Sequence, residues 1–253
     1  MTFAGKEFFL LPFTKEFYSS IAIRCRGSEL RNYSAQESIL HFLSAMCWYY
    51  NDSVNVVSWG NSSSGGILNP GGWRMLHNKR INSCLHMLGS DAMYLYNLQN
   101  DKTAKKALSF YREGLSLGSS FHSYLYYPAY SFLSFYKILE LCFPKSGEKI
   151  EWIGNQLLDI AQENSTEAKK SYQKIVAINS NVSGHIWMSG RNAAAHAHEE
   201  PSYDPGDFKN WNDFFIQLPL IRRLAQKALE NRLGLKTREN IHKMLMKSFY
   251  STK

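Results

Sequence analysis

A short alanine-rich stretch, SGRNAAAHAHEE (Ser189–Glu200), holds the residues best suited to chemistry in this chain. Arg191 offers a planar fork of donors that is always charged and matches the oxygens of a phosphate. His196 titrates near neutrality, so it can act as a general base or a general acid. Asn192 can orient either residue. These residue types suit the cleavage of a phosphodiester bond.

The spacing of the three residues decides how they can meet. On a regular helix, Asn192 and His196 are four residues apart and lie on one face. Arg191 and His196 are five residues apart, which places them about 140° apart around the helix axis. We therefore expect them to converge through a distorted helix, through the reach of the long Arg191 side chain, or through a second copy of the helix from another subunit.

The surroundings of the motif favour a metal-independent reaction on RNA. No cluster of Asp or Glu residues is obviously suited to hold Mg²⁺ there, so we expect neither a metal nor another cofactor. The 2′-OH of RNA is an internal nucleophile. The enzyme then needs only to remove its proton, position the phosphate and stabilise the added charge. The expected products carry 2′,3′-cyclic phosphate and 5′-OH ends.

The elements that must position this motif are mostly helical. Residues 1–77 combine strand-like alternation, in YSSIAIRC and DSVNVVSW, with one helical segment, SAQESILHFLSAMCWYY. Residues 78–253 have a helical pattern with no convincing strand. The sequence therefore predicts a mainly α protein, in which a helical bundle (residues 78–253) carries a small α/β N-terminal part (residues 1–77).

The apolar periodicity of the helical segments predicts which residues face a core. The segment PAYSFLSFYKILELCFP is apolar nearly all round, which predicts a central, buried helix, and an internal ion pair is the favoured role of its Glu140. The expected inward residues of three further helices are Ala107, Leu108, Tyr111 and Leu115, then Ile150, Ile153, Leu157 and Ile160, then Leu220, Ile221, Leu224, Ala225, Ala228 and Leu229.

Basic residues concentrate in the last part of the chain. From Leu218 to Lys253 the sequence has nine basic residues and two acidic ones, so this part carries most of the formal charge of +8. Such a concentration supplies a field that attracts phosphates. The residues expected to bind the RNA backbone are Arg222, Arg223, Lys227 and Arg232. The alternative is a solvated face of two helices that binds no ligand.

The composition predicts a cytoplasmic protein with no membrane partner. Mean hydropathy is −0.35, and no segment approaches the roughly 18 uninterrupted apolar residues of a membrane span. The first residues, MTFAGKEFFLLPFTKEF, lack the pattern of a secretory signal. The four scattered cysteines form no CxxC pair, which predicts reduced thiols instead of disulfides or a zinc site.

The segment RNAAAH is an R-x4-H motif with a polar residue directly after the arginine, placed late in a helical bundle. In this respect the chain resembles the HEPN superfamily (higher eukaryote and prokaryote nucleotide-binding domains). The segments ALSFYREGLSLGSSFHSYLYYPAYSFLSFYKILEL and GRNAAAHAHEEPSYDPGDFKNW are similar to its methylamine-utilisation J-like, or Apea-like, branch. The resemblance covers roughly residues 85–235.

The resemblance implies a function and a role for each motif residue. Arg191 would bind and stabilise the scissile phosphate, Asn192 would position it, and His196 would be the acid/base. Family members of this kind form homodimers with a composite active site, and many are metal-independent endoribonucleases in toxin–antitoxin or phage-defence systems. An antitoxin or sensor protein is thus an expected partner. One branch has a Tyr two residues after the motif His, where this chain has His198, a candidate accessory residue.

Three other interpretations remain open for the motif. Arg191 could pair with a carboxylate in a purely structural role, and the whole domain could be a non-catalytic module that binds a nucleotide or a protein. The segment HAHEE also offers metal ligands. On a helix, residues two apart point to nearly opposite sides, so that cluster needs an irregular backbone to close on one ion. Its candidate ligands are His196, His198, Glu199 and Glu200.

Overall fold

A computed structural model describes the backbone of about two thirds of the chain. The described residues are 2–3, 6–11, 20–23, 28–29, 34–51, 55–58, 74–76, 101–118, 127–164, 166–195, 204, 208–237 and 240. The contacts between Cα atoms divide the chain into two compact units, Met1–Arg112 and Glu113–Lys253. The predicted boundary between residues 77 and 78 lies outside the described residues and stays a prediction.

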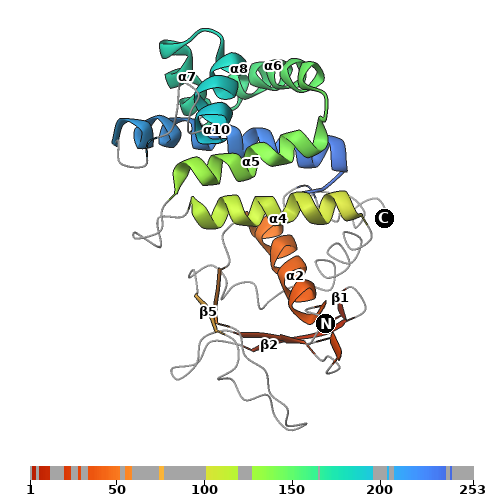
Figure 1. Cartoon of the computed structure of the whole chain (residues 1–253). Helices are drawn as coiled ribbons and strands as arrows, with labels where there is room; N and C mark the ends of the chain where they lie inside the picture. The colour runs from red at the N-terminus through yellow and green to blue at the C-terminus, as the bar shows by residue number, and fades with distance from the viewer. Residues whose placement is uncertain are drawn as a thin grey trace. The chain divides into compact units, whose positions relative to one another are not determined.

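The first unit combines short antiparallel strands with one long helix (Figure 1). Strands β1 (Thr2–Phe3), β2 (Lys6–Leu11) and β3 (Ser20–Ile23) form a sheet in chain order, in which Phe8 lies opposite Ile23. Strands β4 (Asn55–Ser58) and β5 (Arg74–Leu76) form a separate antiparallel pair. The unit also contains helix α2 (Ser34–Tyr50) and residues 102–112 of helix α4 (Lys102–Leu117).

Helix α2 is held by polar and aromatic contacts with Tyr111 and Arg112 of α4. The chain leaves α2 at Asn51, whose positive φ of 52° ends the helix. The Tyr111 hydroxyl donates a hydrogen bond to Asn51 Oδ1, and its ring packs edge-on against Trp48 with 5.2 Å between centroids. Arg112 donates to the carbonyl of Leu40. These contacts tie α2 to a segment distant in sequence.

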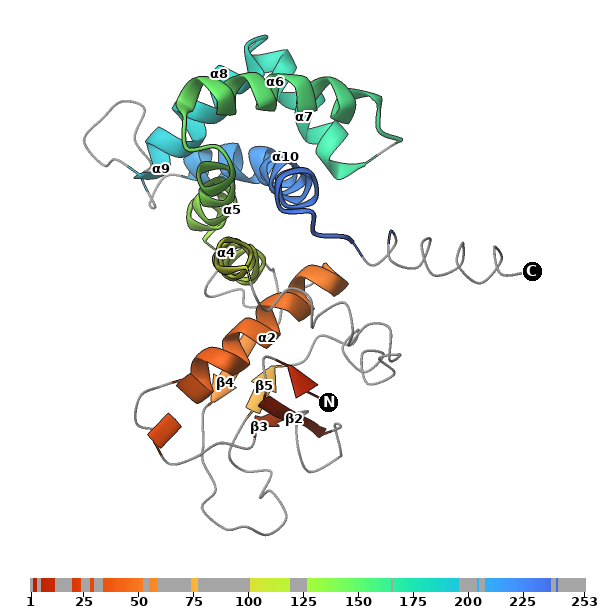
Figure 2. The same ribbon diagram turned by 90° about the vertical axis from the view of Figure 1, so that its right-hand side faces the viewer.

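The second unit is a bundle of helices in which α10 packs along α5 and α7 (Figures 1 and 2). In both views α6, α7 and α8 form a layer over the pair α5 and α10. The elements after α4 are α5 (Pro128–Cys142), α6 (Ser146–Gln162), α7 (Glu167–Ile178), α8 (Val182–His185), the π-helix η3 (Ile186–Asn192), α9 (Ala193–Ala195) and α10 (Phe208–Leu233). The mainly α fold predicted from the sequence is confirmed.

The core follows the predicted apolar stripes with one correction. The inward residues predicted for α4 and α10 are buried, and α5 is a central helix with buried Phe132, Phe135 and Leu139. On α6, Ile153, Leu157 and Ile160 are buried, but Ile150 is 44% exposed. The stripe instead continues through Lys149, because positions three and four residues before Ile153 both fit a period of 3.6.

Helix α10 begins at Phe208 and contains Pro219 in its interior. Pro219 has no N–H to donate to the carbonyl of Phe215, four residues back. The next carbonyl, that of Ile216, accepts a hydrogen bond from the Ser171 hydroxyl of α7, which ties this turn of α10 to α7. Within the described residues, no helix is both long and apolar enough to span a membrane.

The end of α10 depends on a glycine, which generates a stability prediction. Gly234 has a φ of +64°, and this turn lets the N–H of Leu235 donate to the carbonyl of Leu229. Gly234→Ala places a side chain in the left-handed region, so we expect it to lower the free energy of unfolding by about 1 kcal/mol.

The matched control is Gly154→Ala inside α6, where an added Cβ meets nothing within 4 Å. There alanine improves helix propensity, and we expect a stabilisation of about 0.5–1 kcal/mol. Urea unfolding of both variants measures the two changes. Equal effects of the two substitutions would show that the turn at Gly234 does not require glycine.

Candidate functional site

The structure places part of the predicted motif and leaves part of it outside the described residues. Arg191 and Asn192 are the last two residues of η3, and both are half-buried. His196, the predicted acid/base, and His198, the predicted accessory residue, lie outside the described residues, as do Glu199 and Glu200 of the alternative metal set. The roles predicted for these four residues stay predictions.

The backbone that carries Arg191 is a π-helix. A helix distortion was one of the three routes by which the motif was expected to converge, and residues Ile186–Asn192 do depart from α-helical geometry. Widened turns of this kind are rare in proteins as a whole, but those that are present often lie at functional sites. This turn precedes Arg191, so it sets the direction of the Arg191 side chain relative to Trp187 and to the helices beneath.

Gly190 brings the π-helix close to α5. A Cβ at this position would lie 2.3 Å from Cζ of Phe132 and 3.0 Å from Oε1 of Gln217 on α10. Only a residue without a side chain allows such an approach. Because Gly190 immediately precedes Arg191, this contact fixes the height of the motif above α5.

The Arg191 guanidinium is held by a carboxylate, an amide and an aromatic ring. Its Nε lies 3.4 Å from Oε1 of Glu140 on α5, and its Nη1 donates to Oδ1 of Asn192 at 3.2 Å. Its Cζ lies 5.1 Å from the centre of the Trp187 ring. The Asn192 amide nitrogen also contacts the sulfur of Met188. The predicted internal ion pair of Glu140 is present. The roles of Arg191 and Asn192 in binding and positioning a phosphate stay predictions.

A second cation, Lys149 of α6, shares the same carboxylate. Its Nζ lies 4.0 Å from Oε1 of Glu140, and its side chain is 4% exposed. The ammonium also lies 5.1 Å from the ring centre of Tyr136 and 5.4 Å from that of Trp187. We call Tyr136, Glu140, Lys149, Trp187 and Arg191 the shared-carboxylate cluster.

Burial shifts the titration of two members of this cluster. Loss of water lowers the pKa of Lys149; the Glu140 carboxylate opposes that shift, and the Arg191 charge adds to it. Loss of water also raises the pKa of Tyr136 well above its ordinary value, and Glu140 raises it further. Lys149 is therefore a costly buried cation, whereas Tyr136 remains a neutral phenol.

Sequence reasoning missed Lys149, although a signal was available. Lys149 lies four residues before Ile153 and so on the buried stripe of α6, but lysines are rarely buried and an apolar neighbour, Ile150, competes for the same place. Tyr136 and Trp187 carry no motif. Their meeting with Arg191 depends on how α5, α6 and η3 pack, which periodicity alone does not reveal.

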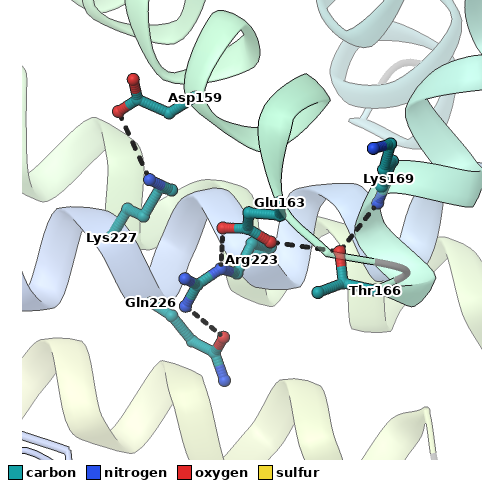
Figure 3. A network of polar contacts seen from close by, with 7 residues as sticks. All are labelled: Asp159, Glu163, Thr166, Lys169, Arg223, Gln226 and Lys227. Atoms are coloured by element: carbon teal, nitrogen blue, oxygen red, sulfur yellow. Dashed lines mark hydrogen bonds and ion pairs between the residues drawn. The ribbon is translucent and has the colours of Figure 1, made fainter.

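The basic residues predicted to bind RNA lie on α10, and three of them form ion pairs with acidic residues from α6 and its C-cap. Figure 3 shows the pairs of Arg223 and Lys227. Arg223 donates to Glu163 at 2.8 Å, and Lys227 lies 3.5 Å from Asp159. Arg232 pairs with Glu148. Arg222 is half-buried on the same helix. These pairs balance the charge of the three residues locally, and the RNA-binding role of all four residues stays a prediction.

A comparison with known protein families finds a match for the region that contains the site. Residues 107–230 match the family described as methylamine utilization protein MauJ. This match confirms the resemblance to the methylamine-utilisation J-like branch that the sequence suggested, and it includes the cluster and the R-x4-H motif. The match does not test the motif itself. No curated protein and no solved structure matches the chain at a significant level.

The contact of Gly190 with Phe132 generates a prediction. We expect Gly190→Ala to lower the free energy of unfolding by about 1–3 kcal/mol, because the added methyl group overlaps a fully buried ring. In a Phe132→Leu background the same substitution should cost less, since the atom it meets has been removed. Urea unfolding of the four proteins gives the coupling. A cost that does not depend on residue 132 would rule out this contact as its source.

A histidine beside the π-helix makes stability depend on pH. His185 lies at the end of α8, and its Nδ1 lies 3.2 Å from the Ser189 hydroxyl. Burial lowers the pKa of His185, and the charge of Asp213 on α10 partly opposes this shift. Below a pH of about 6.5 the unfolded chain takes up a proton that the folded protein binds less readily. Stability is therefore lost as the pH falls through that value.

We expect His185→Gln to weaken this pH dependence. The wild-type free energy of unfolding should fall more steeply than that of the variant between about pH 7.5 and about pH 5.5. Urea unfolding of both proteins at the two pH values measures how far each free energy of unfolding falls. Contributions from other titrating groups cancel when the variant is compared with the wild type. Parallel pH profiles would show that His185 has the same pKa in the folded and unfolded states.

Proposed function

We propose that this protein is a metal-independent endoribonuclease of the HEPN type. In this proposal the 2′-OH of RNA attacks the adjacent phosphate, and the products carry 2′,3′-cyclic phosphate and 5′-OH ends. Arg191 stabilises the scissile phosphate, Asn192 positions it, and His196 transfers the proton. The observation that supports it best is the Arg191–Asn192 pair at the end of a π-helix, within a region that matches the MauJ family.

The surroundings of Arg191 fit a phosphate-binding role. Its side chain is 28% exposed, so an anion in solution can reach it. Asn192 and Trp187 restrain the guanidinium, and such restraint reduces the reorganisation needed when charge develops on the phosphate. The Glu140 carboxylate, which lies beside Arg191, is an anion like the proposed phosphate ligand.

The wider proposal includes partners. We propose a cytoplasmic homodimer in which two copies of the motif face one cleft, with RNA held in part by Arg222, Arg223, Lys227 and Arg232. A toxin or phage-defence role, controlled by an antitoxin or sensor protein, follows from the same resemblance.

The second candidate function is a non-catalytic module that binds a nucleotide or a protein partner. The ion pair between Arg191 and Glu140 favours this alternative, because a residue with a structural carboxylate partner needs no substrate to explain its presence. The two functions differ in their response to removal of His196.

Incubation of the purified protein with total RNA in EDTA tests the proposal. We expect cleavage by the wild type and a loss of rate of about 10²–10⁴-fold in His196→Ala, which lacks the acid/base. Arg191→Ala should lose about 10²–10³-fold, as expected for loss of charge stabilisation. Analysis of the product ends should find cyclic phosphates.

Lys170→Ala is the matched control for Arg191→Ala. It removes an exposed cation of α7 that pairs only locally, with Glu167 of the same helix, and we expect full activity. Full activity of His196→Ala would exclude the assigned acid/base. Absence of cleavage by the wild type, together with binding of a nucleotide or protein, would favour the non-catalytic module.

A further inference from the structure

The shared-carboxylate cluster contains two cations and one acidic residue. Glu140 Oε1 lies 3.4 Å from Nε of Arg191 and 4.0 Å from Nζ of Lys149. The three residues come from α5, η3 and α6, so the cluster exists only in the folded bundle. Both cations of the cluster therefore face the same carboxylate oxygen.

Lys149 is held in an unfavourable place. It lies in the first turns of α6, where the helix dipole disfavours a cation, and its side chain is almost fully buried. Its contact with Glu140 exceeds hydrogen-bond length, and no acceptor in the described part of the chain is within hydrogen-bond reach of its ammonium. The rings of Tyr136 and Trp187 offset only part of this cost. Lys149 therefore retains the capacity to bind a carboxylate more tightly.

Glu140 can change partners. Its side chain is 37% exposed, and its contact with Arg191 is long for a charge-assisted hydrogen bond. A carboxylate and a phosphate present the same kind of oxygen pair to a guanidinium. Glu140 thus occupies a position on Arg191 that a phosphate group would take.

We propose that Glu140 is a displaceable counter-ion of a phosphate-binding site, and that Lys149 is the positioning residue that receives it. When a phosphate group binds Arg191, the Glu140 carboxylate moves from Arg191 onto the Lys149 ammonium. Arg191 then faces the phosphate, and Lys149 faces the Glu140 carboxylate. Trp187 contacts both cations and keeps them in place during the exchange.

This inference deepens the proposed function. It takes RNA as the source of the phosphate, and that choice rests on the proposed function. The displacement itself requires only a phosphate group near Arg191. Binding of an uncleavable ligand therefore tests it without any cleavage. Two probes distinguish the source of the phosphate: a 2′-O-methyl RNA oligonucleotide and inorganic phosphate.

A double-mutant cycle at Glu140 and Lys149 tests the proposal. Glu140→Gln removes the competing anion at nearly constant shape. Each probe that the wild type binds should therefore bind the variant about two- to fivefold more tightly, which is the range of a partly exposed ion pair. Lys149→Met removes the receiver and leaves Glu140 on Arg191, so binding should weaken by a similar factor. In the Glu140→Gln background, Lys149→Met should have no effect, because no carboxylate remains to be received. Fluorescence anisotropy for the oligonucleotide and calorimetry for phosphate give the dissociation constants.

Each contrary result overturns a stated part of the proposal. Weaker binding by Glu140→Gln would mean that Glu140 supports Arg191 instead of competing for it. An equal loss from Lys149→Met in both backgrounds would mean that Lys149 contacts the phosphate itself. If the wild type binds neither probe, the cluster is not a phosphate site. Circular dichroism and urea unfolding of the variants confirm that they are folded. The double variant has the same net charge as the wild type and serves as a reference for both single variants.

The proposed function and this inference can fail separately. A tighter-binding Glu140→Gln variant without any cleavage by the wild type would retain the displaceable counter-ion and reject the ribonuclease. Cleavage by the wild type, with weaker binding by Glu140→Gln, would retain the ribonuclease and reject the displacement.

Discussion

The close approach of Gly190 to Phe132 is the contact on which the candidate site depends. It lets the backbone of the π-helix lie on the Phe132 ring of the central helix α5, because residue 190 has no side chain of its own. Arg191 follows immediately, so its guanidinium is delivered over Glu140, one turn after Tyr136 on α5. A larger residue at position 190 would lift the whole motif from this surface. The geometry of a charged site is thus set by an apolar contact that carries no charge.

Desolvation explains why the cluster has the composition it does. A cation buried among helices is costly, and for Lys149 the Glu140 carboxylate and the rings of Tyr136 and Trp187 offset part of that cost. Glu140 serves two cations because it lies at the border of the buried region, within reach of each. Such sharing weakens each individual contact. The proposed displacement of Glu140 by a phosphate depends on this sharing.

The charges of α10 behave differently from those of the cluster. Arg223 and Lys227 are four residues apart on α10 and meet Asp159 and Glu163, which are four apart at the end of α6 (Figure 3). Glu163 also accepts a hydrogen bond from Thr166, which caps α7. The basic residues thus join three helices of the bundle. A concentration of positive charge in a sequence does not by itself give an equal positive field, since acidic residues distant in the chain fold against it.

The sequence by itself determined the mainly α class and the buried faces of α4 and α10, and it is the source of the proposed motif residues. Helical periodicity is a local property, and the inward residues from Leu220 to Leu229 followed from it directly. It could not decide between Lys149 and Ile150, because both fit the period and only the neighbours Glu140 and Tyr136 make the burial of a lysine tolerable. The tertiary structure alone decided the π-helical turn before Arg191, the packing of Gly190 on Phe132 and the sharing of Glu140. These features join residues about fifty positions apart, and their free energy comes from contacts that exist only when α5, α6 and η3 are packed together.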